Sequence, residues 1–231
     1  DESTTFGGFV EPDPAQMAWL AEDAGADGIT MHIREDRRHV QVEDVQRYLE
    51  KKKTRLNLEV SLDQKMVELA LSLKPESVCL VPENRKEVTT EGGLDVAGNL
   101  ERSREVVQAF TQAGIPTSMF IDPVSSQLEA SAEIGSPWVE LHTGSFARAW
   151  TAPGNPLPEL EELREGVKVG LSLGLRVNAG HGINMENLGG ILCIPHLDTL
   201  NIGHSIICRS VFEGMENSVK EMLTGMQDYE G

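Results

Sequence analysis

The sequence predicts an α/β protein of the TIM (β/α)8-barrel type, formed as a single domain over residues 1–231. Strand-like and helix-like segments alternate along the chain, which indicates a parallel sheet covered by helices. Several strands carry polar side chains on one face toward their carboxyl ends, as expected where a barrel builds its site from many strands. A doubly wound sheet would gather the site at one switch point, and no Gly-x-Gly-x-x-Gly fingerprint occurs. The barrel is therefore preferred.

The first half of the chain gives one isolated helix and three strand–helix pairs. Residues 1–11 are rich in Thr and Gly and are expected to be irregular. Asp13 suits an N-cap and Pro14 suits the first helical position, so a helix is expected over 13–24. The pairs that follow are strand 28–33 with helix 43–53, strand 55–60 with helix 62–73, and strand 77–81 with a helix ending near 113.

The second half continues the alternation to the end of the chain. The predicted elements are strands 116–122, 138–144, 175–182 and 199–204, and helices 124–134, 157–173, 185–193 and 205–227. The seven strands are one fewer than an eight-stranded barrel requires. The strands at 28–33 and 199–203 should therefore be the two edges. The missing first strand is expected upstream of Asp1.

Composition narrows the class of protein. The formal net charge is -17, which argues against nucleic acid or a membrane surface as partner. The chain has no apolar run long enough to cross a membrane. Its three cysteines lack metal-like spacing and are expected to be buried, reduced thiols in a cytoplasmic protein.

The segment 28–39 changes from a strand into a cluster of charged and imidazole side chains. Alternation places Thr30, His32 and Arg34 on one face and apolar side chains on the other. A half-exposed edge strand with a solvated charge run is the alternative interpretation. The same face of other strands carries Asn57 and Glu59, Glu140 and His142, and Asn178 followed by His181.

Seven collinear motifs give a more specific indication. They are Ala24–His39 (AGADGITMHIREDRRH), Arg55–Glu59 (RLNLE), Leu80–Glu83 (LVPE), Glu87–Val96 (EVTTEGGLDV), Glu140–Gly144 (ELHTG), Val177–Gly182 (VNAGHG) and Leu200–His204 (LNIGH). In order and spacing they resemble the pyridoxine 5'-phosphate synthase family over roughly residues 12–225. The resemblance implies a TIM barrel that forms homo-octamers. It also implies condensation of 3-amino-2-oxopropyl phosphate with 1-deoxy-D-xylulose 5-phosphate, without a metal or organic cofactor.

The resemblance assigns roles to the polar residues. His32 and Glu59 match the bases and His181 a general acid, while Glu140 matches the group that stabilises developing charge. His142 supports the site or packs in the core. The matched substrate-binding positions are Arg34, His39 and Thr89 for one substrate, and Gly182, Gly203 and His204 for the phosphate of the other. Phosphate often binds in the last two βα loops of such barrels, against backbone N–H groups.

One departure and two alternatives accompany the resemblance. The family's first strand carries an Asn-x-Asp-His motif followed by an arginine. Residues 1–11 contain no Asn, His or Arg, so this motif is absent from the sequence given. A non-catalytic barrel without that strand is therefore one alternative. A metal-dependent barrel hydrolase or isomerase, with His32, Glu59, His142 and His181 as ligands, is the other.

The long loop 82–95 is expected to be a lid, mobile over 84–93.

Overall fold

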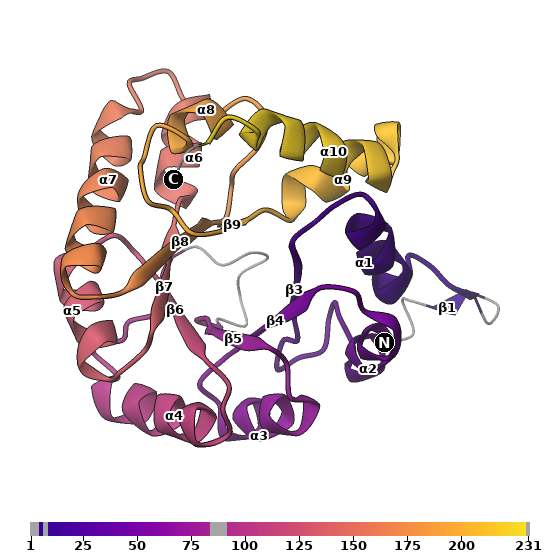
Figure 1. The fold of residues 1–231 in the computed structure, drawn as a ribbon, viewed down its shortest axis with the longest axis horizontal. Coiled ribbons are helices and arrows are strands. Elements are labelled where there is room, and N and C mark those ends of the chain that lie inside the picture. The colour runs from indigo at the N-terminus through magenta and orange to yellow at the C-terminus, as the bar shows by residue number, and fades with distance from the viewer. Residues whose placement is uncertain (1–4, 7–8, 84–91, 230–231) are drawn as a thin grey trace.

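Seven parallel strands form the centre of the molecule and lie side by side in the order of the chain (Figure 1). The computed structural model describes residues 5–6, 9–83 and 92–229. The strands are β3 (Gly28–His32), β4 (Arg55–Val60), β5 (Ser77–Leu80), β6 (Thr117–Ile121), β7 (Trp138–His142), β8 (Arg176–Gly180) and β9 (Leu200–Asn201). The predicted barrel architecture is confirmed.

Helices surround the strands on the outside of this sheet, as Figure 1 shows. They are α1 (Pro14–Asp23), α2 (Val42–Lys51), α3 (Gln64–Leu73), α4 (Leu100–Gln112), α5 (Ser125–Glu133), α6 (Gly144–Thr151), α7 (Leu157–Ser172), α8 (Leu188–Ile191), α9 (His204–Glu213) and α10 (Met215–Met226). Asp13 caps α1 as predicted, since its side chain accepts hydrogen bonds from the backbone N–H groups of Ala15 and Gln16.

Three helices differ from the prediction. Helix α6 was not expected, because it follows the strand 138–144 directly and its first residue is a glycine. Helix α8 covers only part of the expected 185–193. The expected helix 205–227 is two helices, because Gly214 has φ 77° and ψ 156°, a conformation in which a helix cannot continue.

Alternation along the strands separates the core from the barrel interior. On β4, Leu56, Leu58 and Val60 are fully buried among the surrounding helices, while the intervening side chains face inward. Parallel register then aligns the inward groups of neighbouring strands, with Asn57 opposite Thr30 and Glu59 opposite His32 on β3. Polar side chains therefore form layers inside the barrel.

The first residues of the chain correct one expectation. Thr5–Phe6 (β1) and Phe9–Val10 (β2) pair as antiparallel strands in a small sheet separate from the barrel, whereas 1–11 was expected to be irregular. The Gly-Gly dipeptide between two short β-prone segments is a hairpin signal that outweighs the overall Thr/Gly composition.

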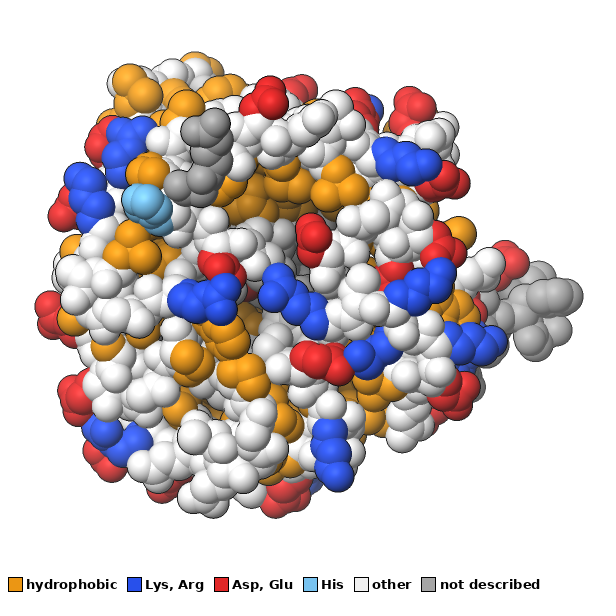
Figure 2. Space-filling view, in the orientation of Figure 1, with side chains coloured by type: hydrophobic (Ala, Val, Ile, Leu, Met, Phe, Trp, Pro, Cys, Tyr) orange, Lys and Arg blue, Asp and Glu red, His pale blue; other side chains and the backbone are white. Residues whose placement is uncertain are grey.

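Strands β3 and β9 are the two ends of the sheet, as predicted. Side chains cross the interval between them: Thr30 Oγ1 donates to Asn201 Oδ1 at 3.0 Å, and Arg55 Nη2 donates to Thr199 Oγ1 at 3.1 Å. Figure 2 shows the surface hollowed near α9, with hydrophobic side chains in the hollow. The barrel is therefore nearly closed, with side-chain contacts where the described chain has no backbone ladder.

Surface properties agree in part with the sequence. Lys and Arg side chains stand among Asp and Glu side chains on the face shown in Figure 2, so the negative net charge is not gathered there in one patch. No helix in the described ranges is long and apolar enough to cross a membrane. All three cysteines are free, but only Cys79 is buried; Cys193, in the turn after α8, and Cys208, on α9, are exposed, so the expectation of three buried thiols was wrong for these two.

Candidate active site

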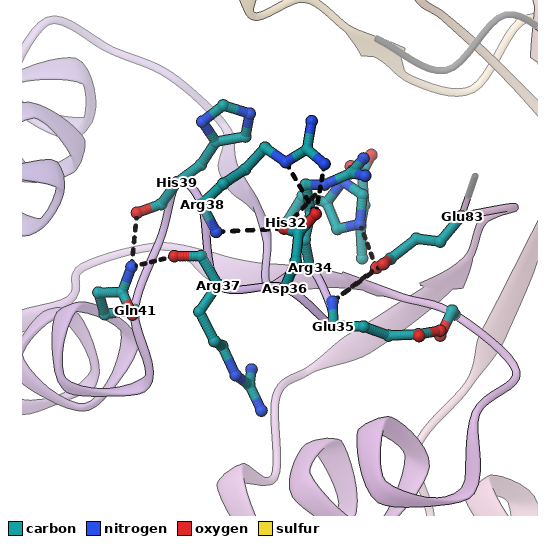
Figure 3. Close-up of polar contacts among 11 residues, drawn as sticks. His32, Arg34, Glu35, Asp36, Arg37, Arg38, His39, Gln41 and Glu83 are labelled. Atoms are coloured by element: carbon teal, nitrogen blue, oxygen red, sulfur yellow. Dashed lines mark hydrogen bonds and ion pairs between the residues drawn. The ribbon is translucent and has the colours of Figure 1, made fainter. Parts of the chain in front are cut away.

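The carboxyl end of β3 brings an imidazole next to two carboxylates. His32 Nδ1 lies 3.7 Å from Glu59 Oε2, and His32 Nε2 lies 3.2 Å from Glu83 Oε1. Glu83 also accepts a hydrogen bond from the Glu35 backbone N–H at 2.9 Å, which holds its carboxylate in place (Figure 3). A histidine held between carboxylates is suited to exchange protons with a bound molecule.

Glu59 is the inward-facing carboxyl group of β4. Burial raises the pKa of Glu59, and the neighbouring His32 imidazole opposes this shift by favouring the carboxylate. A raised pKa makes the Glu59 carboxylate a stronger base, which suits it to remove a proton from a bound molecule.

The loop after β3 gathers charged side chains around one aspartate (Figure 3). Arg34 is buried, and its Nε donates to Asp36 Oδ1 at 3.4 Å. Arg38 Nε donates to Asp36 Oδ2 at 2.8 Å, and this guanidinium holds the pKa of Asp36 below its usual range. His39 is exposed and lies on the side of the loop away from Glu83. The buried Arg34 can thus face an anionic ligand, whereas His39 lies nearer solvent.

Glu140 on β7 is the most deeply buried carboxyl group of the barrel interior. Its side chain is enclosed, and its Oε2 accepts a hydrogen bond from Asn201 Nδ2 at 2.5 Å. Cys79 Sγ lies 3.8 Å from the same oxygen. Burial, together with the nearby Glu59 carboxyl, raises the pKa of Glu140 to about 8. Glu140 is therefore largely protonated at neutral pH and can donate a hydrogen bond to developing negative charge.

Two histidines meet at the ends of β7 and β8. His142 is buried, and its Nδ1 lies 2.9 Å from Asp122 Oδ1. The rings of His142 and His181 have centroids 5.1 Å apart, and Phe120 packs against both. Burial and the charge of His142 lower the pKa of His181. The sequence left His142 between support of the site and core packing; in the structure it is buried, contacts Asp122 and lies against the His181 ring at an interplanar angle of 58°.

His181 is held in an unusual backbone conformation. Its φ is 76°, in the left-handed region, and Gly182 after it has φ 83°. Thr143 Oγ1 lies 3.0 Å from the carbonyl oxygen of Gly180 and also contacts that of His181, so its one hydrogen is shared between the two carbonyls of the turn. A Cβ at Gly182 would lie 2.7 Å from Ala147 Cβ on α6, so only glycine permits this close approach.

The last βα loop places Gly203 at the start of α9. Gly203 is the N-cap of this helix, and an added Cβ there would meet no atom within 4 Å. His204 is the exposed first residue of α9, and its Nε2 lies 3.6 Å from Cys208 Sγ. Free backbone N–H groups in the first turn of a helix attract anions, so the location fits the predicted phosphate site.

The structure thus groups some predicted residues and separates others. His32 and Glu59 form one pair, His142 and His181 another, and Glu140 lies close enough to Glu59 for its pKa to respond. Thr89 and most of the predicted lid 84–93 lie outside the described residues. In the described part of the chain, no group of three or more His, Cys, Asp or Glu side chains is arranged to hold a metal ion.

Several contributing residues were missed by sequence reasoning. Glu83, Asp122 and Asn201 each contact a predicted residue, but none was given a role. Each of the three follows or ends a strand. A polar residue at the carboxyl end of a barrel strand is expected near the site, and this position could have identified them.

Comparison with known proteins places the chain in a family. The family model described as "Pyridoxal phosphate biosynthesis protein PdxJ" matches residues 6–228. The chain is 53% identical to pyridoxine 5'-phosphate synthase of Opitutus terrae, a match that covers 96% of this chain and 90% of that protein. It is 54% identical to the enzyme of the same name from Prochlorococcus marinus, over 92% of this chain and 85% of that protein.

Solved structures support the fold independently of sequence. A 4-hydroxy-2-oxoglutarate aldolase/2-deydro-3-deoxyphosphogluconate aldolase aligns with a TM-score of 0.63 at 15% identity, covering 96% of this chain and 90% of that one. Phosphoribosyl anthranilate isomerase from Thermus thermophilus aligns with a TM-score of 0.57 at 17% identity, covering 92% and 94%. These likenesses concern the fold alone. The family match over nearly the whole chain is decisive, and the protein belongs to the PdxJ family of pyridoxal phosphate biosynthesis proteins.

Proposed function

We propose that this protein is a pyridoxine 5'-phosphate synthase of vitamin B6 biosynthesis. It condenses 3-amino-2-oxopropyl phosphate with 1-deoxy-D-xylulose 5-phosphate and releases pyridoxine 5'-phosphate, phosphate and water, without a metal or organic cofactor. The observation that carries the proposal is the pairing of His32 with the partly buried Glu59 carboxyl group, Nδ1 to Oε2 at 3.7 Å, beside the buried carboxyl group of Glu140 inside one barrel. Near-neutral proton exchange is what this condensation demands of an enzyme.

The reaction needs several proton transfers. An amine adds to a ketone and loses water, carbon-bound protons are removed, phosphate leaves, and the ring closes with a further dehydration. His32 and Glu59 accept protons in this proposal, and His181 donates them. Glu140, neutral at the start, stabilises charge that develops in the transition state. The lowered pKa of His181 makes its protonated form a stronger acid and the minor form at neutral pH.

The two phosphorylated substrates need separate anion sites. The buried guanidinium of Arg34, with His39 and Thr89, is proposed to bind one of them, because a guanidinium can hold a phosphate in a bidentate manner. Gly182, Gly203 and His204 are proposed to hold the phosphate of the other. The open surroundings of Gly203 at the start of α9 support this second site.

The proposal extends to assembly and location in the cell. We infer a homo-oligomer, an octamer by resemblance to the family, in the cytoplasm. Helix α9 supports the assembly, since Ile207, Val211 and Phe212 are 49%, 78% and 86% exposed on one described helix. Apolar side chains left open in this way are typical of protein–protein contacts.

The direct test is a two-substrate assay. Purified protein is incubated with both phosphorylated substrates, and pyridoxine 5'-phosphate and inorganic phosphate are measured separately. Equimolar formation of both products, only when both substrates are present, is expected. The omission of either substrate serves as the control. A well-folded protein that consumes neither substrate would overturn the proposal.

A further inference from the structure

A chain of side-chain hydrogen bonds runs across the barrel interior to Glu140. Ser77 Oγ donates to Asn57 Oδ1 at 2.8 Å, and Asn57 Nδ2 lies 3.4 Å from Thr30 Oγ1. Thr30 Oγ1 donates to Asn201 Oδ1 at 3.0 Å, and Asn201 Nδ2 donates to Glu140 Oε2 at 2.5 Å. The contacts link β5, β4, β3, β9 and β7, and they cross the interval between β3 and β9.

Every bond in this chain points the same way. A hydroxyl group has one hydrogen to donate, and Thr30 gives its hydrogen to the amide oxygen of Asn201. This contact fixes the orientation of the Asn201 side chain, because its oxygen faces Thr30 and its NH2 group must then face Glu140. An Asn amide without such a partner could turn over and present its oxygen instead.

The two oxygens of Glu140 are thereby made different. Oε2 receives the Asn201 donor and has the Cys79 thiol nearby. Oε1 lies over β8, where a Cβ on Gly180 would come within 2.0 Å of it. Only glycine leaves room for the carboxyl group in this position. A proton on the neutral carboxyl group therefore belongs on Oε1, since Oε2 already accepts a hydrogen bond.

We propose that Asn201, oriented by Thr30, is a positioning residue that makes Glu140 Oε2 an acceptor and so keeps the carboxyl proton on Oε1 for the reaction. The inference rests on the proposed synthase function. Asn201 itself touches no reacting atom in this account; it acts through Glu140.

The pKa of Glu140 depends on the titratable side chains around it. Glu59 faces it from β4 and Cys79 from β5, while His142 shares its strand and His32 stands beyond Glu59. The nearby Glu59 raises the pKa of Glu140, and the Asn201 hydrogen bond lowers it. Loss of the Asn201 donor should therefore move the ionisation of Glu140 to higher pH, by about one unit.

The experiment compares variants along the chain. Asn201→Leu removes the donor, Thr30→Val removes only the group that orients it, and Thr30→Ser keeps the hydroxyl. Thr199→Val is the matched control, because Thr199 also bridges the interval to β4 but is not part of the chain that reaches Glu140. Turnover is measured against pH, and the infrared band of the protonated carboxyl group is titrated, with Glu140→Gln used to assign it.

A positioning role predicts two linked effects. Asn201→Leu and Thr30→Val should lower kcat by about tenfold to a hundredfold, because a displaced group of the reacting constellation is costly. In both variants the alkaline limb of the rate profile and the midpoint of the infrared titration should move upward. Thr30→Ser and Thr199→Val should resemble the wild type.

Two results would overturn the inference. One is an unchanged infrared midpoint in Asn201→Leu. The other is an equal loss of activity in Thr199→Val, which would reduce the chain to a structural bridge. The infrared titration needs no substrate, so it tests Asn201 even if the wild type makes no pyridoxine 5'-phosphate, a result that would count against the proposed function alone.

Discussion

His181 shows how one residue combines backbone and side-chain requirements. Its backbone has a left-handed φ between two glycines, Thr143 contacts its carbonyl, and its ring lies tilted against that of His142. Most residues with a Cβ resist this conformation, whereas Asn tolerates it. An Asn at this position should therefore keep the turn and remove the titratable ring.

His181→Asn should fold normally and lose activity. Turnover is expected to fall by about two to four orders of magnitude, the usual contribution of a general acid. His196→Asn is the matched control, because His196 also has a left-handed φ, 65°, but is exposed and precedes β9 at the opposite end of the barrel. Equal turnover in the two variants, with equal melting temperatures, would remove His181 from the mechanism.

The raised pKa of Glu140 implies a cost to stability at higher pH. The carboxyl group is protonated in the folded protein up to a pKa of about 8, but it ionises near 4.5 in the unfolded chain. Between these values the unfolded state binds fewer protons, so stability falls as pH rises. Below the unfolded pKa this cost is absent, and above the folded pKa it is complete.

Glu140→Gln should therefore stabilise the protein in a pH-dependent way. The neutral amide removes the cost, which gives a gain of up to about 4 kcal/mol near pH 8 and little change near pH 4. Chemical denaturation at the two pH values measures the difference, and Glu162→Gln on the exposed face of α7 is the control. A gain that does not grow with pH would contradict a raised pKa.

The order and faces of the strands followed from alternation, whereas the partners of the reactive groups did not. Glu59 and Glu140 were placed inside the barrel by period-two spacing alone. Their contacts with His32 and Asn201 depend on parallel register and on the return of β9 toward β3, which spacing within one strand does not specify. Contacts of Glu83 and Asp122 were missed for the same reason.

Single glycines set several helix boundaries, and hydrophobic periodicity alone did not predict them. Gly214 ends α9 and begins α10, because its backbone conformation is open only to glycine. Gly144 instead begins α6, an element that apolar periodicity did not indicate. At the start of α9 the same residue type has another role, since Gly203 has an ordinary φ of -116° and open space around it.

Gly203→Val tests the phosphate site at the start of α9 without disturbing the fold. The melting temperature should stay close to that of the wild type, because a Cβ at this exposed position meets no atom of the protein within 4 Å. Binding of the phosphorylated substrate at this loop should weaken by an order of magnitude or more, since the side chain occupies the space of the anion. Calorimetric titration with inorganic phosphate gives the comparison. Unchanged phosphate affinity would place the anion elsewhere.

The whole molecule places its reactive groups at one end of a nearly closed barrel. The imidazole–carboxylate pair of β3 and β4, the buried carboxyl group of β7 and the histidine after β8 come from strands spread around the sheet. A strand-by-strand sequence reading could identify this arrangement, because parallel strands bring their carboxyl ends to the same side. It could not identify the side-chain contacts of Thr30 on β3 and Arg55 on β4 with the segment of β9, which depend on how far the sheet curves.

A crystal structure of the protein with pyridoxine 5'-phosphate would show whether the product binds inside the barrel. We expect the pyridine ring within hydrogen-bonding reach of His32, Glu59, Glu140 or His181, with its phosphate against the backbone of Gly182 and Gly203. The buried position of Glu140 requires the ring to enter the barrel from the carboxyl ends of the strands. Product bound outside the barrel, or at the opposite end beside His196, would show that these residues do not form the active site.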